Sequence, residues 1–462
     1  MFAKARISLL DKKNIMRSTF FILVLVFTDV LSVIASNKIA FAQDAVVSTD
    51  LKHESVQLAR IGPERRFGRL PAGVLYTRTG ESPKTVVLFV HPESDSRNDW
   101  RAAELAEKGF GTFGLATRYV KEDHHNILEE VMLDLAEAIR FLKEERGFTY
   151  VILHGHSGGG GTVSFYQNQA QTEPPNRVSH TPAGNPPNLN QYDLPPADGL
   201  ILSSAHLGRG YAVARKLDPS VVDENDPLSV DPSLDLFDPA NGYRIPPEAS
   251  EHSEEFMERF RLAQHARMQR LMAKAFAMIE EKRIYQRLLE APDFEDRPAR
   301  EQLNIQRGAV MQRYMTIYRN FANPFYVDPT IDPNDRALGA GGAPISGSRP
   351  DLYNYYAHFH PRNTTPEAFL SGNSLASNIF TPDLLPQVTV PLLVTIGSAD
   401  PSARMSESRT HYEVAGGEDK EFIVIEGADH SYNPAGPKAG ARNQREQLIE
   451  ALADWLSERF PH

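Results

Sequence analysis

The chain has 462 residues, a net charge of −11, 41% hydrophobic residues and 24% charged residues, a composition typical of a globular protein and not of a disordered one. The acidic balance and the lack of a dense basic stripe argue against a general nucleic-acid binder, so we expect partners that are small or neutral. With no cysteine, disulfides, a thiol nucleophile and lipid attachment through an N-terminal cysteine are excluded.

The N-terminus predicts an export signal. Basic residues precede an apolar run at 20–27, and Ala40 and Ala42 supply small residues at the spacing of a cleavage site. We therefore expect residues 1–42 to be a signal peptide cleaved near Ala42, and the mature chain to be periplasmic or secreted. The apolar run is short and Asp29 follows it, which disfavours a permanent membrane span, although retention as an uncleaved anchor stays an alternative.

Strands and helices alternate up to residue 206. Apolar runs predict strands at 65–70, 73–77, 85–90, 110–116, 150–153 and 199–204. Amphipathic patterns with capping residues predict helices at 100–108, 127–146 and 162–169. Strands separated by helices imply a mostly parallel sheet with helices on both faces.

About 180 residues then separate the strand at 199–204 from the next apolar run, too many for a plain connection inside a compact domain. Helical spacing predicts helices at 253–282 and 301–321, and the Pro-, Gly- and Asp-rich segment 323–361 is expected to form long loops. Strands return at 391–396 and 421–425, before a last amphipathic helix. We expect an α/β core formed by residues 43–206 and 389–462, with residues 207–388 as a large, mainly helical cap or lid insertion.

The most informative motif is Gly155-His156-Ser157-Gly158-Gly159, which directly follows the strand at 150–153. A serine hydroxyl is a poor nucleophile unless a tight turn exposes it to a base, and glycines give that turn its room. A phosphate-binding loop is disfavoured because no Lys-Ser or Lys-Thr pair follows the glycines. The motif therefore indicates a serine nucleophile.

Two further polar residues follow later strands. Asp400 comes after the strand at 391–396, and His430 comes after the strand at 421–425. Loops beyond the carboxyl ends of parallel strands converge, so Ser157, Asp400 and His430 can meet. Asp429 is a rival acid, but adjacent residues seldom share a face, which favours Asp400.

The chain has the Gly155–Gly159 motif and the order Ser, Asp, His, with each residue after a predicted strand. In these features it resembles the α/β-hydrolase fold superfamily, in particular its serine esterases and lipases. The resemblance implies that Ser157 is the nucleophile, that His430 transfers the proton, and that Asp400 orients the imidazole. It also implies an oxyanion hole, with Gly158 N–H as one donor. Pro92 has no N–H, so Glu93 is expected as the second donor and Ser94 as the next choice, which departs from the His-Gly-Gly pattern of many lipases.

Four histidines lie near the same edge: His91, His154, His156 and His206. No metal-ligand spacing supports a metal site, and we expect His91, His156 and His206 to lie around the substrate. Asp328, Asp332 and Asp335 lack the glycine and glutamate of a calcium loop. Neither a metal nor another cofactor is expected.

The insertion offers aromatic side chains for an apolar substrate pocket, although helical spacing is more typical of packing inside the insertion. These residues are Tyr314, Tyr318, Tyr353, Tyr355, Tyr356 and Phe359.

The sequence predicts a secreted serine hydrolase that cleaves a carboxylic ester through an acyl-enzyme. The same triad acting on an amide, lactone or C–C bond stays open, as does a non-catalytic binding protein on this fold. A haloalkane dehalogenase or epoxide hydrolase is disfavoured because those enzymes use an aspartate nucleophile. The natural substrate and the oligomeric state do not follow from the sequence.

Overall fold

The computed structural model describes residues 50–63, 69–339, 349–356, 362–440 and 443–462. The predicted signal peptide, residues 1–42, lies outside these ranges. None of the helices in the described part of the chain is both long and apolar enough to cross a membrane.

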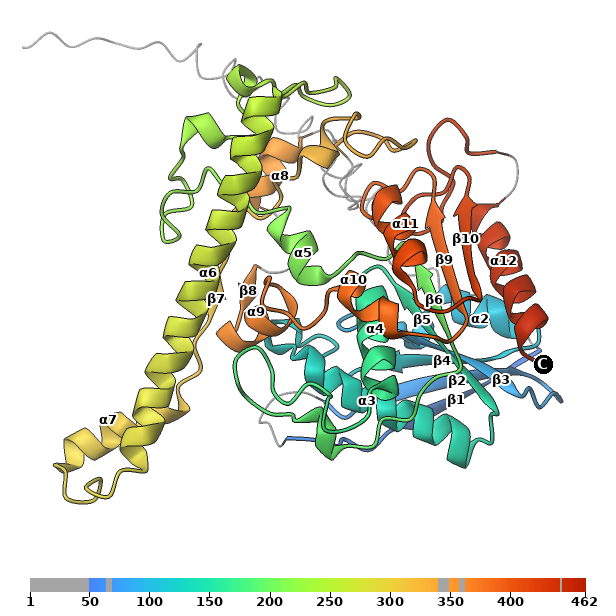
Figure 1. Ribbon diagram of the computed structural model, residues 1–462, viewed down its shortest axis with the longest axis horizontal. Helices are drawn as coiled ribbons and strands as arrows, with labels where there is room; N and C mark the ends of the chain where they lie inside the picture. Colours follow the sequence, from blue (N-terminus) through green and yellow to red (C-terminus); the bar gives the residue numbers. More distant parts are fainter. Residues whose placement is uncertain (1–49, 64–68, 340–348, 357–361, 441–442) are drawn as a thin grey trace, which may run out of the picture. The chain divides into compact units, whose positions relative to one another are not determined.

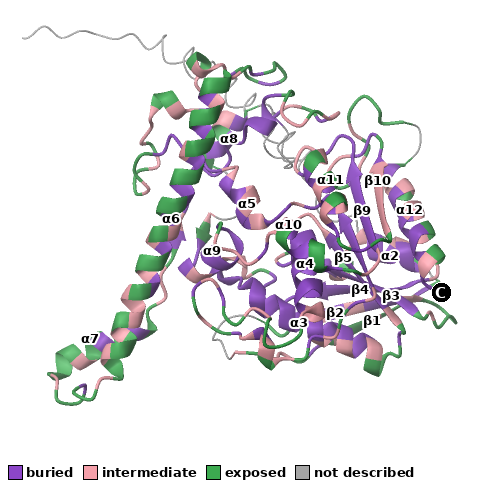
Figure 2. Cartoon of the chain, viewed as in Figure 1, coloured by how far each residue is buried: buried purple, intermediate pink, exposed green. Residues whose placement is uncertain are grey.

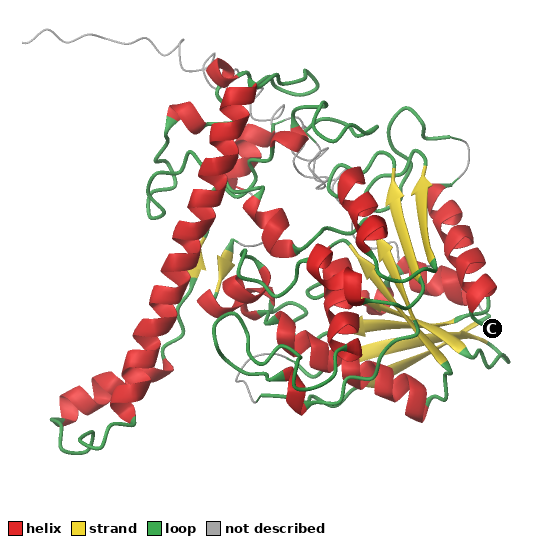
Figure 3. Cartoon of the chain, in the orientation of Figure 1, coloured by secondary structure: helices red, strands yellow, loops and turns green. Residues whose placement is uncertain are grey.

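The centre of the molecule is an eight-stranded sheet with the order β1-β2-β4-β3-β5-β6-β9-β10 (Figures 1 and 3). The strands β2, β1 and β4 pair antiparallel, and the pairings from β4 to β10 are parallel. Its members are β1 (Leu51–Gln57), β2 (Ala72–Arg78), β3 (Thr85–Val90), β4 (Gly111–Ala116), β5 (Tyr150–His156), β6 (Gly199–Ser203), β9 (Leu392–Gly397) and β10 (Lys420–Ile425). The predicted mostly parallel sheet is confirmed.

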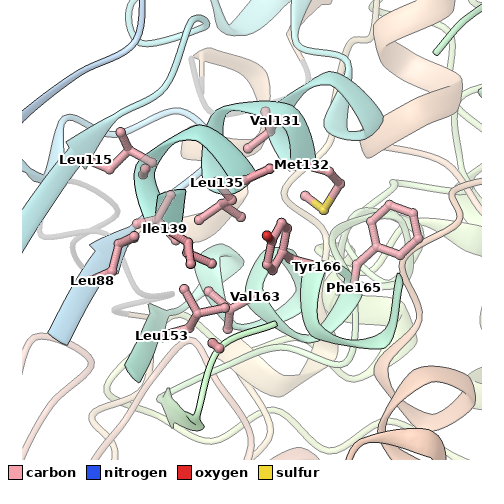
Figure 4. Packing of buried hydrophobic residues seen from close by; sticks show 14 of the residues in the cluster. Leu88, Leu115, Val131, Met132, Leu135, Ile139, Leu153, Val163, Phe165 and Tyr166 are labelled. Atoms are coloured by element: carbon pink, nitrogen blue, oxygen red, sulfur yellow. The ribbon is translucent and has the colours of Figure 1, made fainter. Parts of the chain in front are cut away.

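Helices cover both faces of this sheet, and the alternation of side chains along β3 shows how. Val86, Leu88 and Val90 belong to one apolar cluster, together with residues of α3 (Leu128–Arg140) and α4 (Gly158–Gln171). Figure 4 shows this packing, with Leu88, Leu115 and Leu153 of three strands against Val131, Leu135 and Ile139 of α3. Val87 and Phe89 belong to a second cluster, with α2 (Trp100–Glu107) and α12 (Gln444–Arg459) on the opposite face. Helix α11 (Met405–Val414) contributes its last residues to the first cluster.

Two details of the core differ from the sequence predictions. The predicted strand at 65–70 is wrong in its described part, because residues 69 and 70 are outside any strand and residues 64–68 are outside the described ranges. The first strand is instead β1, an edge strand in which only Leu51 is buried. The predicted helix at 127–146 is α3 followed by a π-helical segment, η4 (Phe141–Glu145).

Between β6 and β9 lies a large insertion that is mainly helical, as predicted. Its elements are α5 (Arg209–Ala214), η6 (Pro232–Leu234), η7 (Pro239–Asn241), α6 (Glu254–Leu289), α7 (Ala299–Val310), β7 (Met315–Thr316), η8 (Pro324–Tyr326), α8 (Pro350–Tyr356), β8 (Asn363–Thr364), α9 (Pro366–Gly372), α10 (Thr381–Leu384) and η9 (Leu385–Gln387). Exposed and buried residues alternate along α6, whereas the central strands are buried throughout (Figure 2). The domain boundaries at 206 and 388 stay a prediction.

The predicted helix at 301–321 is wrong in its second half. Helix α7 ends at Val310, and Met315–Thr316 form β7, which pairs antiparallel with β8. The N–H of Ile317 also donates to the carbonyl of Arg362 at 2.8 Å. The β-branched side chains of Thr316 and Ile317 favour an extended backbone, and the partner strand lies too far along the chain for periodicity to reveal it.

Candidate active site

Ser157 lies at the sharp turn between β5 and α4, with φ 55° and ψ −120°. The tight turn that holds this strained conformation is sterically possible because Gly155, Gly158 and Gly159 have no side chain. A Cβ on Gly155 would lie 2.4 Å from the carbonyl oxygen of Gly159, and one on Gly159 would lie 2.5 Å from that of Val90. We call residues 155–159 the elbow. It presents the Ser157 side chain at the carboxyl edge of the sheet, at the N-terminus of α4.

The three residues predicted as a triad are brought together at this edge. His430 Nε2 lies 3.0 Å from Ser157 Oγ, and His430 Nδ1 lies 2.9 Å from Asp400 Oδ2. A carboxylate only accepts, so Nδ1–H donates to Asp400 and Nε2 is left as the acceptor for the serine hydroxyl. Asp400 is fully buried, and its Oδ1 accepts from the N–H groups of Ser402 at 2.7 Å and Ala403 at 2.9 Å.

Asp429, the rival acid, lies in a different arrangement. Its Oδ1 accepts from the N–H groups of Ser431 and Asn433, both at 2.8 Å, and so closes the turn that follows β10. Asp400, and not Asp429, therefore contacts the imidazole.

Two further imidazoles flank His430. The His156 ring lies 4.8 Å from the His430 ring, and its Nε2–H donates to the His430 carbonyl at 2.8 Å. The His206 ring stacks on the His430 ring at 6.0 Å, and its Nδ1 lies 3.5 Å from Oε2 of Glu407. His156 and His206 thus contact the proposed base itself, and their predicted contacts with substrate stay a prediction.

Burial disfavours the charged form of both neighbouring imidazoles. It lowers the pKa of His156 well below its ordinary value, with Arg101 adding to the effect. Burial also lowers the pKa of His206, although Glu407 opposes the shift. Beneath them, burial and then Arg101 lower the pKa of His154 to about 3. Neutral neighbours do not repel the positive charge that His430 gains when it accepts a proton.

The predicted oxyanion donors occupy contrasting positions. Gly158 is the first residue of α4, where an N–H has no acceptor within the helix. The N–H of Glu93 is directed at Nδ1 of His91 at 3.3 Å, and the N–H of Ser94 is directed at the same atom at 3.0 Å. His91 therefore stands between this loop and the elbow.

The insertion places Arg209, which the sequence analysis missed, beside the elbow. Its guanidinium bonds the carboxylate of Glu93, and its Nη2 donates to Asn373 Oδ1 at 2.7 Å. The methylene Cδ of Arg209 would lie 3.5 Å from a Cβ on Gly158. An arginine between two glycines, a few residues after the strand at 199–204, is the signal that was available in the sequence.

A cavity of about 320 Å³ opens next to Ser157 and His430. Its other lining residues are Phe89, Val90, His91, Ser94, Asp95, Ser96, Asp99, Arg101, His154 and His156. The predicted aromatic pocket does not line this cavity in the described part of the chain. Tyr353 is buried within the insertion against Phe321, Tyr355 and Tyr356 are exposed, and Phe359 lies outside the described residues.

Tyr314 and Tyr318 are also directed elsewhere. Tyr314 bonds Nε2 of His125 at 3.1 Å, and the Tyr318 ring contacts Arg362.

The acidic residues considered for calcium are each engaged separately. Asp328 accepts from Thr330, Asp332 bonds Ser406, and Asp335 bonds Ser398 and Lys438. Within the described ranges, three potential metal ligands gather in and beside η3 (Asp123–His125), namely Glu122, His124 and His125, with ligand atoms within 4.8 Å of one another. None of these three residues lines the cavity at Ser157.

No protein-family model matches the chain, and no curated protein sequence matches it. Solved structures resemble it distantly. A structure of DcsB in complex with its substrate analogue is 12% identical, covers 87% of this chain and 98% of its own, and has a TM-score of 0.42. Est1E from Butyrivibrio proteoclasticus is 12% identical over 87% and 98%, with a TM-score of 0.39. A monoacylglycerol lipase from Paleococcus ferrophilus is 15% identical over 89% and 99%, with a TM-score of 0.35.

Proposed function

The chain has the α/β-hydrolase fold, by its strand order and its strand-to-helix turns, and on this premise we propose that it is a serine hydrolase acting on a carboxylic ester. The observation that carries the proposal is the chain of hydrogen bonds from Asp400 through His430 to Ser157, at 2.9 and 3.0 Å. In this proposal Ser157 is the nucleophile, His430 the general base and acid, and Asp400 the group that fixes the tautomer of His430.

The reaction has two halves. Ser157 Oγ attacks the ester carbonyl while its proton moves to His430 Nε2, and the carbonyl oxygen becomes an oxyanion. When the tetrahedral intermediate collapses, the C–O bond to the alcohol breaks and His430 returns the proton to the departing oxygen. Water then attacks the acyl-enzyme, with His430 again accepting and returning a proton, which releases the acid and regenerates the serine.

Electrostatics at the elbow support this chemistry. The developing oxyanion forms at the N-terminus of α4, where the helix dipole and the Gly158 N–H favour negative charge. The positive charge on His430 is compensated by Asp400, and burial disfavours a competing positive charge on His156 and His206 by lowering the pKa of each.

Reaction with a fluorophosphonate probe tests this proposal, because such probes phosphonylate only activated serines. We expect labelling of the wild-type protein and its loss in Ser157→Ala. Ser457→Ala, which removes an exposed hydroxyl from α12, is the matched control and should label like the wild type. Well-folded protein that does not label would favour the non-catalytic binding protein. Hydrolysis of esters, amides and lactones of one acyl group then identifies the bond that is cleaved.

We further propose that residues 1–42 direct export to the periplasm or medium. The basic start, the apolar run at 20–27 and the small residues at Ala40 and Ala42 support this. N-terminal sequencing of the protein from a cell envelope or culture fraction should give a chain that begins near Gln43. An intact Met1 in the cytoplasmic fraction would contradict export.

A further inference from the structure

His91, at the end of β3, has a defined tautomer. Its Nδ1 accepts two backbone N–H groups, from Glu93 at 3.3 Å and Ser94 at 3.0 Å. A ring nitrogen that accepts a hydrogen bond carries no hydrogen, and a neutral imidazole has one. The hydrogen of neutral His91 is therefore on Nε2.

This Nε2–H faces the elbow. A Cβ built on Gly158 would lie 3.2 Å from His91 Nε2, and His91 and Ser157 line the same cavity. The two backbone N–H groups that the sequence analysis considered as second oxyanion donors are both turned toward the ring. The ring in turn presents a single donor toward the residue that follows Ser157.

We propose that the Nε2–H of His91 is the second donor to the oxyanion, in place of the backbone N–H of Glu93. The inference rests on the proposed function, since the oxyanion forms only if Ser157 attacks a carbonyl. The two N–H groups at Nδ1 hold the ring in one tautomer, so the donor is in place before the reaction starts. Arg209 supports this loop from the insertion by bonding the carboxylate of Glu93.

Substitution of His91 by asparagine or by glutamine separates the role of oxyanion donor from a structural role in the loop. Asparagine can supply a polar atom near the position of Nδ1 and keep the loop bonded, without a donor at the position of Nε2. Glutamine can supply an N–H near Nε2. With p-nitrophenyl acetate, we expect His91→Ala and His91→Asn to lower kcat by about 10² to 10³ with little change in KM, and His91→Gln to exceed His91→Asn by about tenfold or more.

A trifluoromethyl ketone, which forms an oxyanion on the serine, supplies a second readout. Its inhibition constant should rise across the variants as kcat/KM falls, in inverse proportion. Full activity in His91→Asn with loss in His91→Gln would overturn the proposal and leave His91 as a loop anchor. In unmutated protein, ¹⁵N NMR should find His91 protonated at Nε2, and protonation at Nδ1 would also overturn it. Absence of fluorophosphonate labelling of Ser157 would instead overturn the proposed function.

The composition of the cavity at Ser157 supports a separate inference about the substrate. Only Phe89 and Val90 are apolar among its lining residues, and the buried polar ones are Ser96, Arg101 and His154, with Asp99 partly exposed. Asp99 accepts from Arg101 Nε at 2.9 Å and Nη2 at 2.6 Å, and Asp95 accepts from Arg97 Nε at 2.8 Å and Nη2 at 2.6 Å, so an arginine compensates each carboxylate. His154 and His156 are neutral because burial lowers the pKa of each. The cavity wall thus offers hydrogen bonds with little net charge.

We propose that the substrate group entering this cavity is small, neutral and rich in oxygen, such as a hydroxyl- or alkoxy-bearing acyl or alcohol group. This deepens the proposed function by naming the substrate class. An alkyl chain would displace water from these polar groups without replacing its hydrogen bonds, which disfavours binding. A volume of about 320 Å³ is at the lower end of ligand cavities, so the group is small.

Two pairs of nearly isosteric esters test this. In the acyl pair, p-nitrophenyl methoxyacetate is compared with p-nitrophenyl butyrate; in the alcohol pair, glycerol monoacetate is compared with 2-methylbutyl acetate. We expect the polar member of at least one pair to have a kcat/KM at least about tenfold higher, after division by the ratio of the alkaline hydrolysis rates. Ser96→Ala should lower that preference, whereas Ser82→Ala, in an exposed loop, is the matched control.

Preference for the alkyl member in both pairs would overturn the substrate class while leaving the hydrolase proposal standing. Failure to hydrolyse any of the four esters, with no labelling of Ser157, would overturn the hydrolase proposal itself.

Discussion

The elbow and the insertion meet at Gly158, beside Arg209, but different interactions hold them. The elbow is fixed through the backbone: Ser157 N–H donates to the Ser203 carbonyl at 3.0 Å, and Gly160 N–H donates to the Ser157 carbonyl at 3.1 Å. The insertion has apolar clusters of its own, and its segments are also joined by polar side chains, among them Asp218 with Arg319 at 2.6 Å and, toward α3, Asn378 with Glu129 at 2.8 Å.

The contrast indicates how the chain can keep one chemistry and change its specificity. Backbone hydrogen bonds and absent side chains tolerate almost no added atoms, so the geometry of the elbow is fixed by steric exclusion. Buried ion pairs in the insertion depend on named partners, and the loss of one partner leaves an uncompensated charge. The following substitutions test whether the two regions respond in these different ways.

The largest effect is expected at the triad acid. Asp400→Asn should lower kcat by about 10⁴, because an amide no longer fixes the His430 tautomer or stabilises the imidazolium. Asp429→Asn changes the neighbouring acid in the same way but touches only the turn at Ser431 and Asn433. Steady-state hydrolysis should therefore separate the two variants by orders of magnitude, and similar losses in both would contradict the assignment of Asp400.

A methyl group at the elbow should damage folding itself. The Cβ of Gly155→Ala would meet the Gly159 carbonyl oxygen at 2.4 Å, a contact that needs a backbone shift in both β5 and α4. We expect a loss of more than about 4 kcal/mol in the free energy of unfolding, measured by denaturant titration. Gly440→Ala, whose Cβ would approach only Lys438 O at 4.0 Å, is the control and should stay within about 0.5 kcal/mol. Equal stability of the two variants would refute the steric argument.

Inside the insertion, removal of one buried charge should lower the free energy of unfolding by as much as Gly155→Ala does, or by less. Asp218 Oδ2 accepts from Arg319 Nη2 at 2.6 Å and from Asn354 Nδ2 at 2.7 Å, and both ions are buried. Asp218→Ala leaves Arg319 uncompensated and should cost about 3 to 5 kcal/mol. Asp226→Ala, at an exposed turn of the same insertion, should cost less than about 1 kcal/mol.

Labelling of Ser157 in Asp218→Ala also tests whether the elbow and the insertion are stabilised independently. Because the triad is held by the core, fluorophosphonate labelling of Asp218→Ala should persist below its unfolding transition, while ester hydrolysis falls. Simultaneous loss of labelling and stability would mean that the elbow depends on the insertion.

Much of the core could be predicted because its signals are local. The buried strand at 85–90 is a continuous apolar run, and the elbow is five consecutive residues. Strand β1 was missed because Lys52, His53 and Glu54 interrupt any apolar pattern, as an exposed edge strand allows. In the insertion, β7 depends on pairing with β8, nearly fifty residues later, which no local pattern encodes.

In the site too, some residues have a local sequence signal and others depend on how the chain folds. Ser157, Asp400 and His430 each follow a strand, so strand order alone predicted their meeting. The tautomer of His91 depends on where two amide hydrogens point, and the contact of Arg209 with the elbow depends on how the insertion packs. Both are properties of the folded backbone, and residue type alone did not reveal them.

The smallest effect concerns pH and the contact between α10 and α11. His411 is fully buried, and its Nε2 lies 2.9 Å from Thr381 Oγ1. Burial lowers the pKa of His411 to about 4 from an ordinary value of 6.5. Between these values the unfolded chain binds a proton that the folded protein does not, so the free energy of unfolding falls as the pH falls, by about 1.4 kcal/mol per pH unit for this residue.

His411→Gln keeps an amide near Thr381 but cannot titrate, so it should gain stability relative to the wild type as the pH drops from 6.5 toward 4. The difference between the two proteins isolates His411, because Glu129 and Asp134, whose pKa values are raised by burial, contribute equally to both. His265→Gln, at an exposed position of α6, is the matched substitution. A constant difference between His411→Gln and wild type across this range, in denaturant titrations, would mean that His411 is protonated in the fold. The α10–α11 contact would then carry a buried charge.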